Sequence, residues 1–574
     1  MYQSFLASIS PAKLIAFFLL CALPILFAPF QSDDFFHLLL LSEMMPLPMQ
    51  EDASLWGLFS LVQQGSDYQQ AMMRHGVLPW YTGSDFHFTF WRPLAEISHW
   101  LDFQLFPFNA VWAHSHNLLW FIALALLLYR LCQQLALPKA TALLAFAVFL
   151  LQSHHAPTIE WIANRNALMA AFFALLSFSC YLHFHDTQRK SFLACSLLCW
   201  VLAIASGEAA LALAGYYFAY TLLLDKTTIR QKVLRLMPYV LLTLTWLLWY
   251  KNAGFGTGGS AIAYIDPFSQ PMAFALSVLQ KIPVYLFTAF SFVPAEVYSI
   301  ADLLSAKLGL IYLGIMLLAL LLLFGMVYPI IKEHTKAQFF LLGGMVSIIP
   351  FCSLPAQDRL LLIPSLGFCV VIAIVIQQTF SRDWHHLSGA RALLLKVAAI
   401  ALIVQHLILA PVLFAFTANV IRQDAESTKH LALSLPNTAA NADQLIIFDS
   451  SVINSAVLKP IRIFADKPIP NEVVLLAAGN KPIIERISEN HFTITKSQGF
   501  VSRFEQTFRN LSSQPFHQGD VIRIGQTELI IQTLNEQGQP VTIDVKLLAP
   551  FDSYQFVTES DGEFKTLSLP EVGQ

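Results

Sequence analysis

Long apolar segments separated by polar loops fill the first two thirds of the chain. About eleven of them approach the roughly 20-residue length with which a helix crosses a bilayer. They are residues 13–29, 113–132, 140–152, 167–183, 191–206, 209–224, 236–250, 308–331, 337–354, 360–378 and 393–416. The pattern therefore predicts a mainly α-helical, polytopic membrane domain over residues 1–416.

Two stretches of this part depart from the pattern. Residues 30–112 form a long first loop with many aromatic residues, prolines and charges of both signs. Residues 272–293 are apolar but contain Lys281 and Pro283. Because a charge inside a span is costly and a proline interrupts a helix, we expect an interfacial or re-entrant helix there.

The pattern changes again after residue 416. Residues 417–443 are interpreted as a linker, and residues 444–574 contain short runs of β-type residues separated by turn residues. These runs are 445–448, 461–464, 473–476, 491–495, 521–524, 529–533 and 541–547. We therefore expect a small antiparallel β-domain, a sandwich or a partial barrel, outside the membrane. It contains no recognisable catalytic motif, so an enzyme lacking residues 444–574 is expected to keep some activity.

Composition agrees with a membrane protein. The 574 residues are 56% hydrophobic and 12% charged, whereas soluble domains have roughly 25% charged residues. The net charge of −3 gives no reason to expect nucleic acid as a partner. All seven cysteines lie before residue 370, so the polar C-terminal region has no disulfide framework.

Lysines and arginines are concentrated in alternate loops. Most of them lie at residues 130–139, 189–190, 226–235, 332–336 and 382–396, on the same side as Lys13. Cytoplasmic loops carry an excess of these residues. We therefore expect a cytoplasmic N-terminus, with the first loop, residues 153–166, residues 355–359 and the C-terminal region facing outward.

Two adjacent carboxylates, Asp33 and Asp34, follow the first apolar segment. They have two interpretations. Acidic residues at the start of a helix cap it and complement its dipole. Alternatively, a carboxylate pair at the membrane edge activates a hydroxyl group or holds a cation.

Further ionisable residues gather in the segments that are expected to face outward. Arginine suits phosphate because its guanidinium is planar and permanently charged. Together with the carboxylates, these arginines predict an outward site that takes a lipid-borne phosphate and deprotonates an acceptor. The residues are Arg92, Asp102, His114, Asn117, Glu160, Arg165, Glu208, Asp358 and Arg359.

Structural roles are open for most of these residues. The three arginines sit where a side chain reaches the headgroup region, Glu160 is placed to cap a helix, and Glu208 follows a glycine in a tight turn. The histidines lack the spacing of a zinc site, so no metal ligands are assigned. A divalent cation held by carboxylates stays open as a cofactor.

Four stretches together resemble the GT-C superfamily of integral-membrane glycosyltransferases. The most similar branch contains the protein O-mannosyltransferases and the transmembrane mannosyltransferases with tetratricopeptide repeats. The stretches are Asp33-Asp34-Phe35; F-W-R-P-L at 90–94 with L-D-F-Q-L-F at 101–106 and His114-x-x-Asn117; E-W-I-A-N-R at 160–165; and D-R-L-L-L-I-P-S-L-G-F at 358–368.

The resemblance implies a glycosyltransferase of a bacterial inner membrane, with a periplasmic C-terminal domain. It would move a sugar from a polyprenyl-phosphate donor to an acceptor hydroxyl of a protein, lipid or glycan on the extracytoplasmic face. It implies Asp33 or Asp34 as the general base or the acid that orients the acceptor, and Arg92, Arg165 and Arg359 at the donor phosphate. The supporting residues would be Asp102, His114, Asn117, Glu160, Glu208 and Asp358.

Some positions differ from the family pattern. Asn164 replaces a glycine, Gly207 replaces a lysine, and Leu360 and Leu362 replace tyrosines; the tetratricopeptide repeats are replaced by the β-type region. The sugar and the acceptor therefore stay open. The alternatives are a transporter or flippase for a lipid-linked glycan and a cell-envelope assembly protein. A transporter would need charges on both sides and near the midplane, whereas the ionisable residues here cluster at the outward ends.

Overall fold

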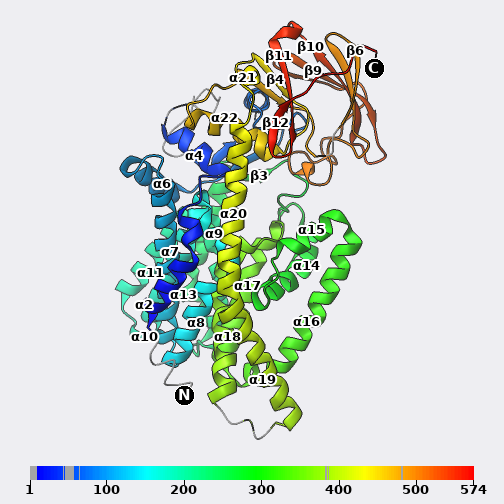
Figure 1. Cartoon of the computed structure of the whole chain (residues 1–574). Helices are drawn as coiled ribbons and strands as arrows, with labels where there is room; N and C mark the ends of the chain where they lie inside the picture. Colours follow the sequence, from blue (N-terminus) through cyan, green and yellow to red (C-terminus); the bar gives the residue numbers. More distant parts are fainter. Residues whose placement is uncertain are drawn as a thin grey trace. The chain divides into compact units, whose positions relative to one another are not determined.

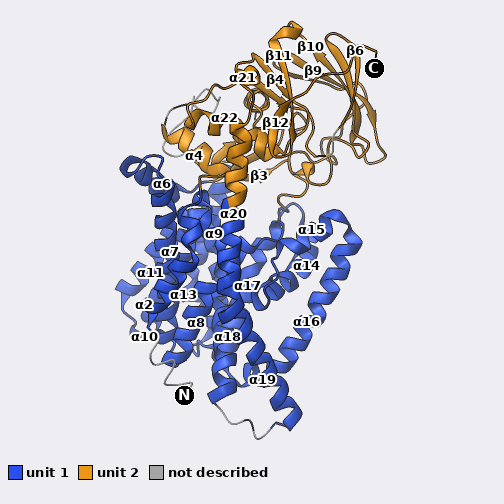
Figure 2. Cartoon of the chain, viewed as in Figure 1, with its two compact units in different colours: residues 1–28, 91–252, 265–422 blue, residues 29–90, 253–264, 423–574 orange. Residues whose placement is uncertain are grey.

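The computed structural model describes residues 10–42, 44, 57–63, 65–381, 384, 387–479 and 482–573. Arg382, one of the basic residues used for orientation, lies outside this part. Figure 1 labels the elements, and Figure 2 shows the two compact units into which the chain divides. Unit 1 comprises residues 1–28, 91–252 and 265–422, and unit 2 comprises residues 29–90, 253–264 and 423–574.

Unit 1 is built from α-helices. They are α2 (Pro11–Cys21), α3 (Leu23–Leu26), α6 (Pro93–Leu105), α7 (Ala110–Gln134), α8 (Lys139–Leu151), α9 (Ala156–Glu160), α10 (Arg165–Thr187), α11 (Lys190–Ser206), α12 (Ala214–Leu223), α13 (Ile229–Asn252), α14 (Pro271–Phe290), α15 (Glu296–Leu304), α16 (Ala306–Glu333), α17 (Thr335–Ile348), α18 (Leu362–Ser381), α19 (Gly389–Ile403) and α20 (Ala410–Leu433), which continues into unit 2.

Short 3-10 helices join several of these elements. They are η2 (Ser153–His155), η3 (Ile162–Asn164), η4 (Glu208–Leu213), η5 (Ile349–Ser353) and η6 (Asp358–Leu361), and a π-helical turn, η7 (Val404–Leu409), links α19 to α20. Most of the predicted site residues of unit 1 lie in or beside these breaks, where a helical path is interrupted and side chains from different helices meet.

Within the described residues, eight helices are long and apolar enough to cross a membrane, or nine if the bent pair α8 and η2–α9 counts as one span. This is fewer than the eleven segments expected. The first segment breaks at Ala22 into the short helices α2 and α3, with Pro24 in the first turn of α3, and residues 209–224 divide into η4 and α12. Conversely, α14 meets the criterion of a span although we expected an interfacial helix.

Helix α18 lies at the centre of unit 1. It is buried along almost its whole length. A helix that is apolar on all sides is covered by other elements, and α18 packs against α8, α17 and α19. It therefore fixes the position of η6, which precedes it and carries Arg359.

Unit 2 contains three sheets. The first has the order β1 (Ser60–Val62), β2 (His87–Thr89), β3 (Gly256–Gly258). The second is antiparallel, with β6 (Ile483–Ser488), β7 (His491–Thr495), β10 (Pro540–Leu547), β9 (Thr527–Leu534) and β8 (Val521–Ile524). The third has β12 (Glu563–Thr566), β11 (Tyr554–Ser560), β4 (Gln444–Ile447) and β5 (Glu472–Leu475). Its helices are α4 (Asp33–Ser42), α5 (Ser66–Arg74), α21 (Asn437–Ala440) and α22 (Val452–Phe464).

The third sheet corrects the expectation of a purely antiparallel domain. Strand β4 runs parallel to both β5 and β11. Parallel neighbours need a crossover connection, and α22 supplies it between β4 and β5. Residues 461–464, expected to form a strand, are the last turn of this helix.

The expected linker over 417–443 is also largely helical, because α20 continues to Leu433 and α21 follows. Neither glycine nor proline occurs between Pro411 and Pro436, so nothing in that stretch interrupts the helix.

The first loop and the C-terminal region share one hydrophobic core. Trp80 and Tyr81, each 1% exposed, belong to the same cluster as Ile446, Val474 and the strands of the second sheet. The indole of Trp80 donates a hydrogen bond to the carbonyl of Leu476 at 2.9 Å. Residues 29–90 are thus part of unit 2, although the sequence pattern placed them with the membrane domain.

Candidate functional site

The centre of the candidate site in unit 1 is Arg165, the first residue of α10. Its side chain is fully buried. The guanidinium pairs with Asp102 (Nη1 to Oδ2, 2.5 Å) and donates to Asn117 (Nε to Oδ1, 2.7 Å). It also donates to the hydroxyl of Ser98 at 3.1 Å and to the carbonyl of Ala113 at 3.1 Å. The break at η3 allows α10 to start inside the protein, where this guanidinium joins α6 to α7.

Asp102 of α6 accepts further hydrogen bonds from α7. The indole of Trp112 donates to its Oδ1 at 3.0 Å, and His116 Nδ1 lies 2.8 Å from the same oxygen. Burial alone would raise the pKa of Asp102, but the hydrogen bond from His116 and the charge of Arg165 outweigh it and lower that pKa. Asp102 is therefore an ionised carboxylate that neutralises the buried guanidinium.

His116 is held in one tautomer by its neighbours. The indole N–H of Trp120 donates to His116 Nε2 at 3.1 Å, so the ring proton lies on Nδ1, facing Asp102. Trp112, His116 and Trp120 lie on one face of α7 because they are spaced four residues apart. Sequence reasoning missed the two tryptophans, and this spacing is the signal that would have found them.

His114 and Asn117 connect α7 to other parts of unit 1. His114 is fully buried and its Nε2 donates to the carbonyl of Ala28 at 3.1 Å. The amide of Asn117 donates to the carbonyl of Ile159 at 2.9 Å. Glu160, at the end of α9, is fully buried next to this point. These residues hold the broken segment 153–164 against α7.

Arg92 and Glu208 form a second ion pair. Two nitrogens of Arg92 lie 3.0 and 2.9 Å from Glu208 Oε2, and the hydroxyl of Tyr250 donates to Oε1 at 2.6 Å. The side chains of Arg92 and Glu208 are 17% and 26% exposed. This pair is thus more accessible than the pair of Arg165 and Asp102, and it joins the start of α6 to η4 and α13.

Arg359 lies in η6 and is half-buried. Its Nε donates to Gln357 Oε1 at 2.6 Å, its guanidinium lies 4.9 Å from the centre of the Trp161 ring, and its carbonyl accepts from Thr158 at 3.3 Å. The neighbouring Asp358 is buried. Arg359 therefore belongs to the same broken-helix region as Arg165, since Thr158 and Trp161 flank Glu160.

Asp33 and Asp34 lie in unit 2, in the first turn of α4. Asp34 is 2% exposed, and its Oδ2 accepts the backbone N–H of Gln31 at 3.1 Å. Asp33 is half-buried. Both carboxylates thus lie where negative charge complements the helix dipole, and Asp33 is the more accessible of the two.

Among the described residues, no group of three or more histidine, cysteine, aspartate or glutamate side chains is arranged to hold a metal ion.

Three solved structures are similar to this chain. The oligosaccharyltransferase of Archaeoglobus fulgidus, tethered to an acceptor peptide with the N-V-T sequon, is 11% identical with a TM-score of 0.36; the match covers 77% of this chain and 63% of that enzyme. ArnT from Cupriavidus metallidurans without ligand is 12% identical with a TM-score of 0.34 and coverages of 72% and 82%. ArnT bound to undecaprenyl phosphate is 11% identical with a TM-score of 0.35 and coverages of 87% and 96%.

This chain spans less than two thirds of the length of the archaeal enzyme. No family model matches the sequence, and no curated protein sequence matches it.

Proposed function

We propose that this chain is an integral-membrane glycosyltransferase that moves a sugar from a polyprenyl-phosphate donor to an acceptor hydroxyl on the extracytoplasmic face. The main support is that two of the four stretches carrying the family resemblance meet in one hydrogen-bonded cluster. Asp102 of L-D-x-x-L-F and Asn117 of H-x-x-N both contact Arg165 of W-I-x-x-R.

The exposure of the arginines supports a division of their roles. Arg165 is fully buried and already has a carboxylate and three other acceptors. In this proposal it shapes the site by joining α6 to α7. Arg359 and Arg92 are more accessible and contact the donor phosphate directly, because a guanidinium binds phosphate through two parallel hydrogen bonds.

The chemical step needs a base and a stabilised leaving group. The carboxylate takes the proton of the acceptor hydroxyl while its oxygen attacks the anomeric carbon. The bond between that carbon and the phosphate oxygen breaks, and polyprenyl phosphate leaves with both electrons. Arginine charge stabilises the phosphate as the negative charge develops. We assign the base to Asp33 because Asp34 is buried and accepts a backbone N–H.

Sugar transfer by the purified protein in lipid vesicles tests this function. A mixture of polyprenyl-phosphate sugars, each labelled in the sugar, serves as donor, and label in candidate peptide, lipid and glycan acceptors is measured. Asp33→Asn is expected to lower kcat by about 100-fold or more, the usual contribution of a general base. Asp67→Asn, an exposed first-turn carboxylate of α5, is the matched control and should keep full activity.

Full transfer activity in the double variant Asp33→Asn/Asp34→Asn would overturn the proposal. Movement of intact donor across the vesicle membrane without formation of a glycosylated product would favour a flippase instead. The proposed location is a bacterial inner membrane with a cytoplasmic N-terminus and a periplasmic C-terminal region. Topology reporters fused at residues 13 and 574 should therefore be found on opposite sides of the membrane.

A further inference from the structure

Lys281 makes an unusual contact for a residue in an apolar helix. It lies at the midpoint of α14, a helix of spanning length. Its ammonium group donates to two backbone carbonyls, those of Leu354 at 2.6 Å and Cys352 at 3.1 Å. Ser277, one turn earlier on the same face, donates to the carbonyl of Cys352 at 2.6 Å. One face of α14 is therefore built to hold the segment that follows η5.

These carbonyls need partners for a general reason. The last carbonyls of a helix have no N–H donors within the helix, and positive charge at that end is favourable. Lys281 supplies both the donors and the charge at the end of η5. Among the described residues, the hydrogen-bond partners of its ammonium group are these two carbonyls and include no carboxylate. A charged side chain at this depth is costly, so a functional role is the default expectation.

The rest of the segment is held in the same way. Ile265 N–H donates to the carbonyl of Ser353 at 2.8 Å, and the hydroxyl of Ser299 in α15 donates to the carbonyl of Ala356 at 2.9 Å. Asp358 accepts from the N–H of Ala295 and donates its own N–H to Glu296, both at 2.8 Å. Residues 354–357, between η5 and η6, thus have no helix or strand of their own. Residues 352–358 are held by Ile265, by α14 and by the start of α15 and the residue before it.

Arg359 follows this segment directly. Its Nε is bound to Gln357 at 2.6 Å, so the position of its guanidinium depends on the conformation of the residue two positions before it. We propose that Lys281 is a positioning residue that fixes residues 352–358 and thereby aims Arg359 at the phosphate of the donor. The donor role of Arg359 in this inference depends on the proposed glycosyltransferase function.

Hydrogen exchange and kinetics of Lys281→Met test the inference in the full-length protein. Backbone amides of residues 352–361 are expected to exchange at least tenfold faster, while those of α10 are unchanged. The KM for the donor should rise about tenfold, with kcat reduced less than threefold, because the base is untouched. Lys281→Arg should restore both values. Lys307→Met, an exposed lysine at the start of α16, is the matched control.

Unchanged exchange of residues 352–361 in Lys281→Met would overturn the inference, even if KM rises, because Lys281 would then act on the donor directly. If Lys281→Met does not insert, Ser299→Ala must give the same faster exchange, and native exchange there would also overturn it. Faster exchange in Lys281→Met combined with no transfer by the native protein would contradict the proposed function and leave the fixing of this segment supported.

Discussion

Arg165 and Asp102 of unit 1 form an ion pair in which the arginine is fully buried. Removing one partner of a buried pair leaves an uncompensated charge, which costs about 3–5 kcal/mol, whereas replacing both by apolar residues costs much less. The sequence alone indicated both residues as candidates, but it gave no sign that Arg165 is fully buried. Burial is what separates its proposed role from that of Arg359.

Asp102→Asn is therefore expected to destabilise the protein by about 3–5 kcal/mol, because the Arg165 guanidinium stays buried without its carboxylate. The double variant Asp102→Leu/Arg165→Met should be more stable than Asp102→Asn. Thermal unfolding in detergent measures the difference. A Tm of Asp102→Asn equal to that of the native protein would contradict the assignment of a buried pair.

His75 gives unit 2 a predictable pH dependence. Burial, together with the charges of Lys459 and Arg74, lowers its pKa from 6.5 to about 4. Between these values the unfolded chain binds a proton that the native protein does not. The free energy of unfolding therefore decreases as the pH falls from 6.5 to about 4.

Replacement of His75 tests this prediction. Its Nδ1 lies 2.8 Å from Nζ of Lys459. His75→Gln keeps an acceptor for Lys459 but has no titrating ring, so the decrease in Tm across this pH window should become smaller. His517→Gln, whose side chain is 73% exposed, should leave the decrease unchanged. An identical pH profile for His75→Gln and the native protein would refute the assignment.

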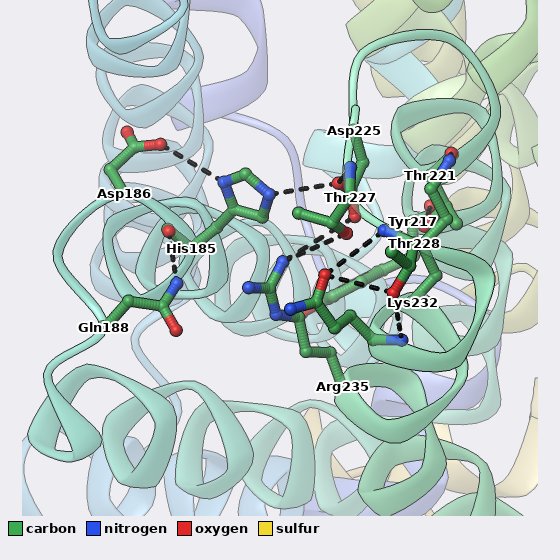
Figure 3. Close-up of polar contacts among 11 residues, drawn as sticks. His185, Asp186, Gln188, Tyr217, Thr221, Asp225, Thr227, Thr228, Lys232 and Arg235 are labelled. Atoms are coloured by element: carbon green, nitrogen blue, oxygen red, sulfur yellow. Dashed lines mark hydrogen bonds and ion pairs between the residues drawn. The ribbon is translucent and has the colours of Figure 1, made fainter.

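Among the elements, α10 joins two polar clusters. It starts at Arg165, and twenty residues later, about 30 Å along the helix, His185 lies between Asp186 and Asp225 (Figure 3). The distances from the ring nitrogens to these carboxylates are 3.4 and 3.2 Å. Asp225 also accepts the N–H of Thr227 at 2.8 Å. The second cluster fixes the loop between α12 and α13 at the end of α10 opposite the candidate site.

The two carboxylates beside His185 are expected to differ in importance. Asp225 has a fully buried side chain, whereas that of Asp186 is 64% exposed. Asp225→Ala should destabilise unit 1 by about 1–3 kcal/mol and increase trypsin cleavage at Lys226, because Thr227 and His185 lose their acceptor. Asp186→Ala should change stability by less than about 0.5 kcal/mol. Equal cleavage of the two variants would contradict this.

Because Asp225 is a carboxylate, the loop between α12 and α13 is expected to lose stability at low pH. Burial would raise its pKa, but the hydrogen bonds from Thr227 and the contacts with His185 outweigh it and lower that pKa below 3.8. A carboxyl with a lowered pKa stabilises the native state at higher pH and loses this effect as the pH falls below about 4. Trypsin cannot be used below pH 4, so pepsin is the protease for this measurement. Its cleavage of residues 224–228 in the native protein should increase below that pH.

The sequence predicted the exact ends of some strands and missed other elements. Strands β7 and β8 were predicted with their observed ends because their apolar residues alternate between turn residues. Residues 461–464 also alternate, but they are the end of an amphipathic helix that only the longer window from Ser451 reveals. Residues 417–433 are polar, and polarity alone did not distinguish a linker from a solvated helix.

The candidate site was predicted in part for a similar reason. The motifs gave Asp102, Asn117 and Arg165, and their resemblance to one family suggested that they act together. Their direct contact joins positions up to 63 residues apart, which no local pattern determines. Lys281 was noticed only as an interruption of an apolar segment, since its partners are backbone carbonyls at the end of η5, about 70 residues away, and have no side-chain signature.

At the scale of the whole molecule, the shared core of unit 2 changes the expected effect of a deletion. Removing residues 444–574 exposes apolar side chains that belong to the same core as the C-terminal strands. They are Trp80, Tyr81 and the buried apolar residues of α4 and α5. We now expect this deletion to abolish sugar transfer, because the segment that carries Asp33 loses its core. Retained activity in the deleted protein would show that residues 29–90 fold alone.

A single substitution should have part of the same effect. Trp80→Ala removes a fully buried indole and its hydrogen bond to Leu476, with an expected loss of about 3–5 kcal/mol. Protease cleavage within residues 29–90 measures the unfolding of this segment. Trp100→Ala, at an exposed tryptophan of α6, is the control.

Strand β3 has a practical consequence for anyone who wishes to study unit 2 alone. It comes from residues 253–264, which follow α13, so the backbone passes from one unit to the other after residues 28, 90, 252, 264 and 422. A gene fragment encoding only residues 423–574 would lack two of its three contributing segments. Autonomous expression would require splicing all three into a new, continuous reading frame.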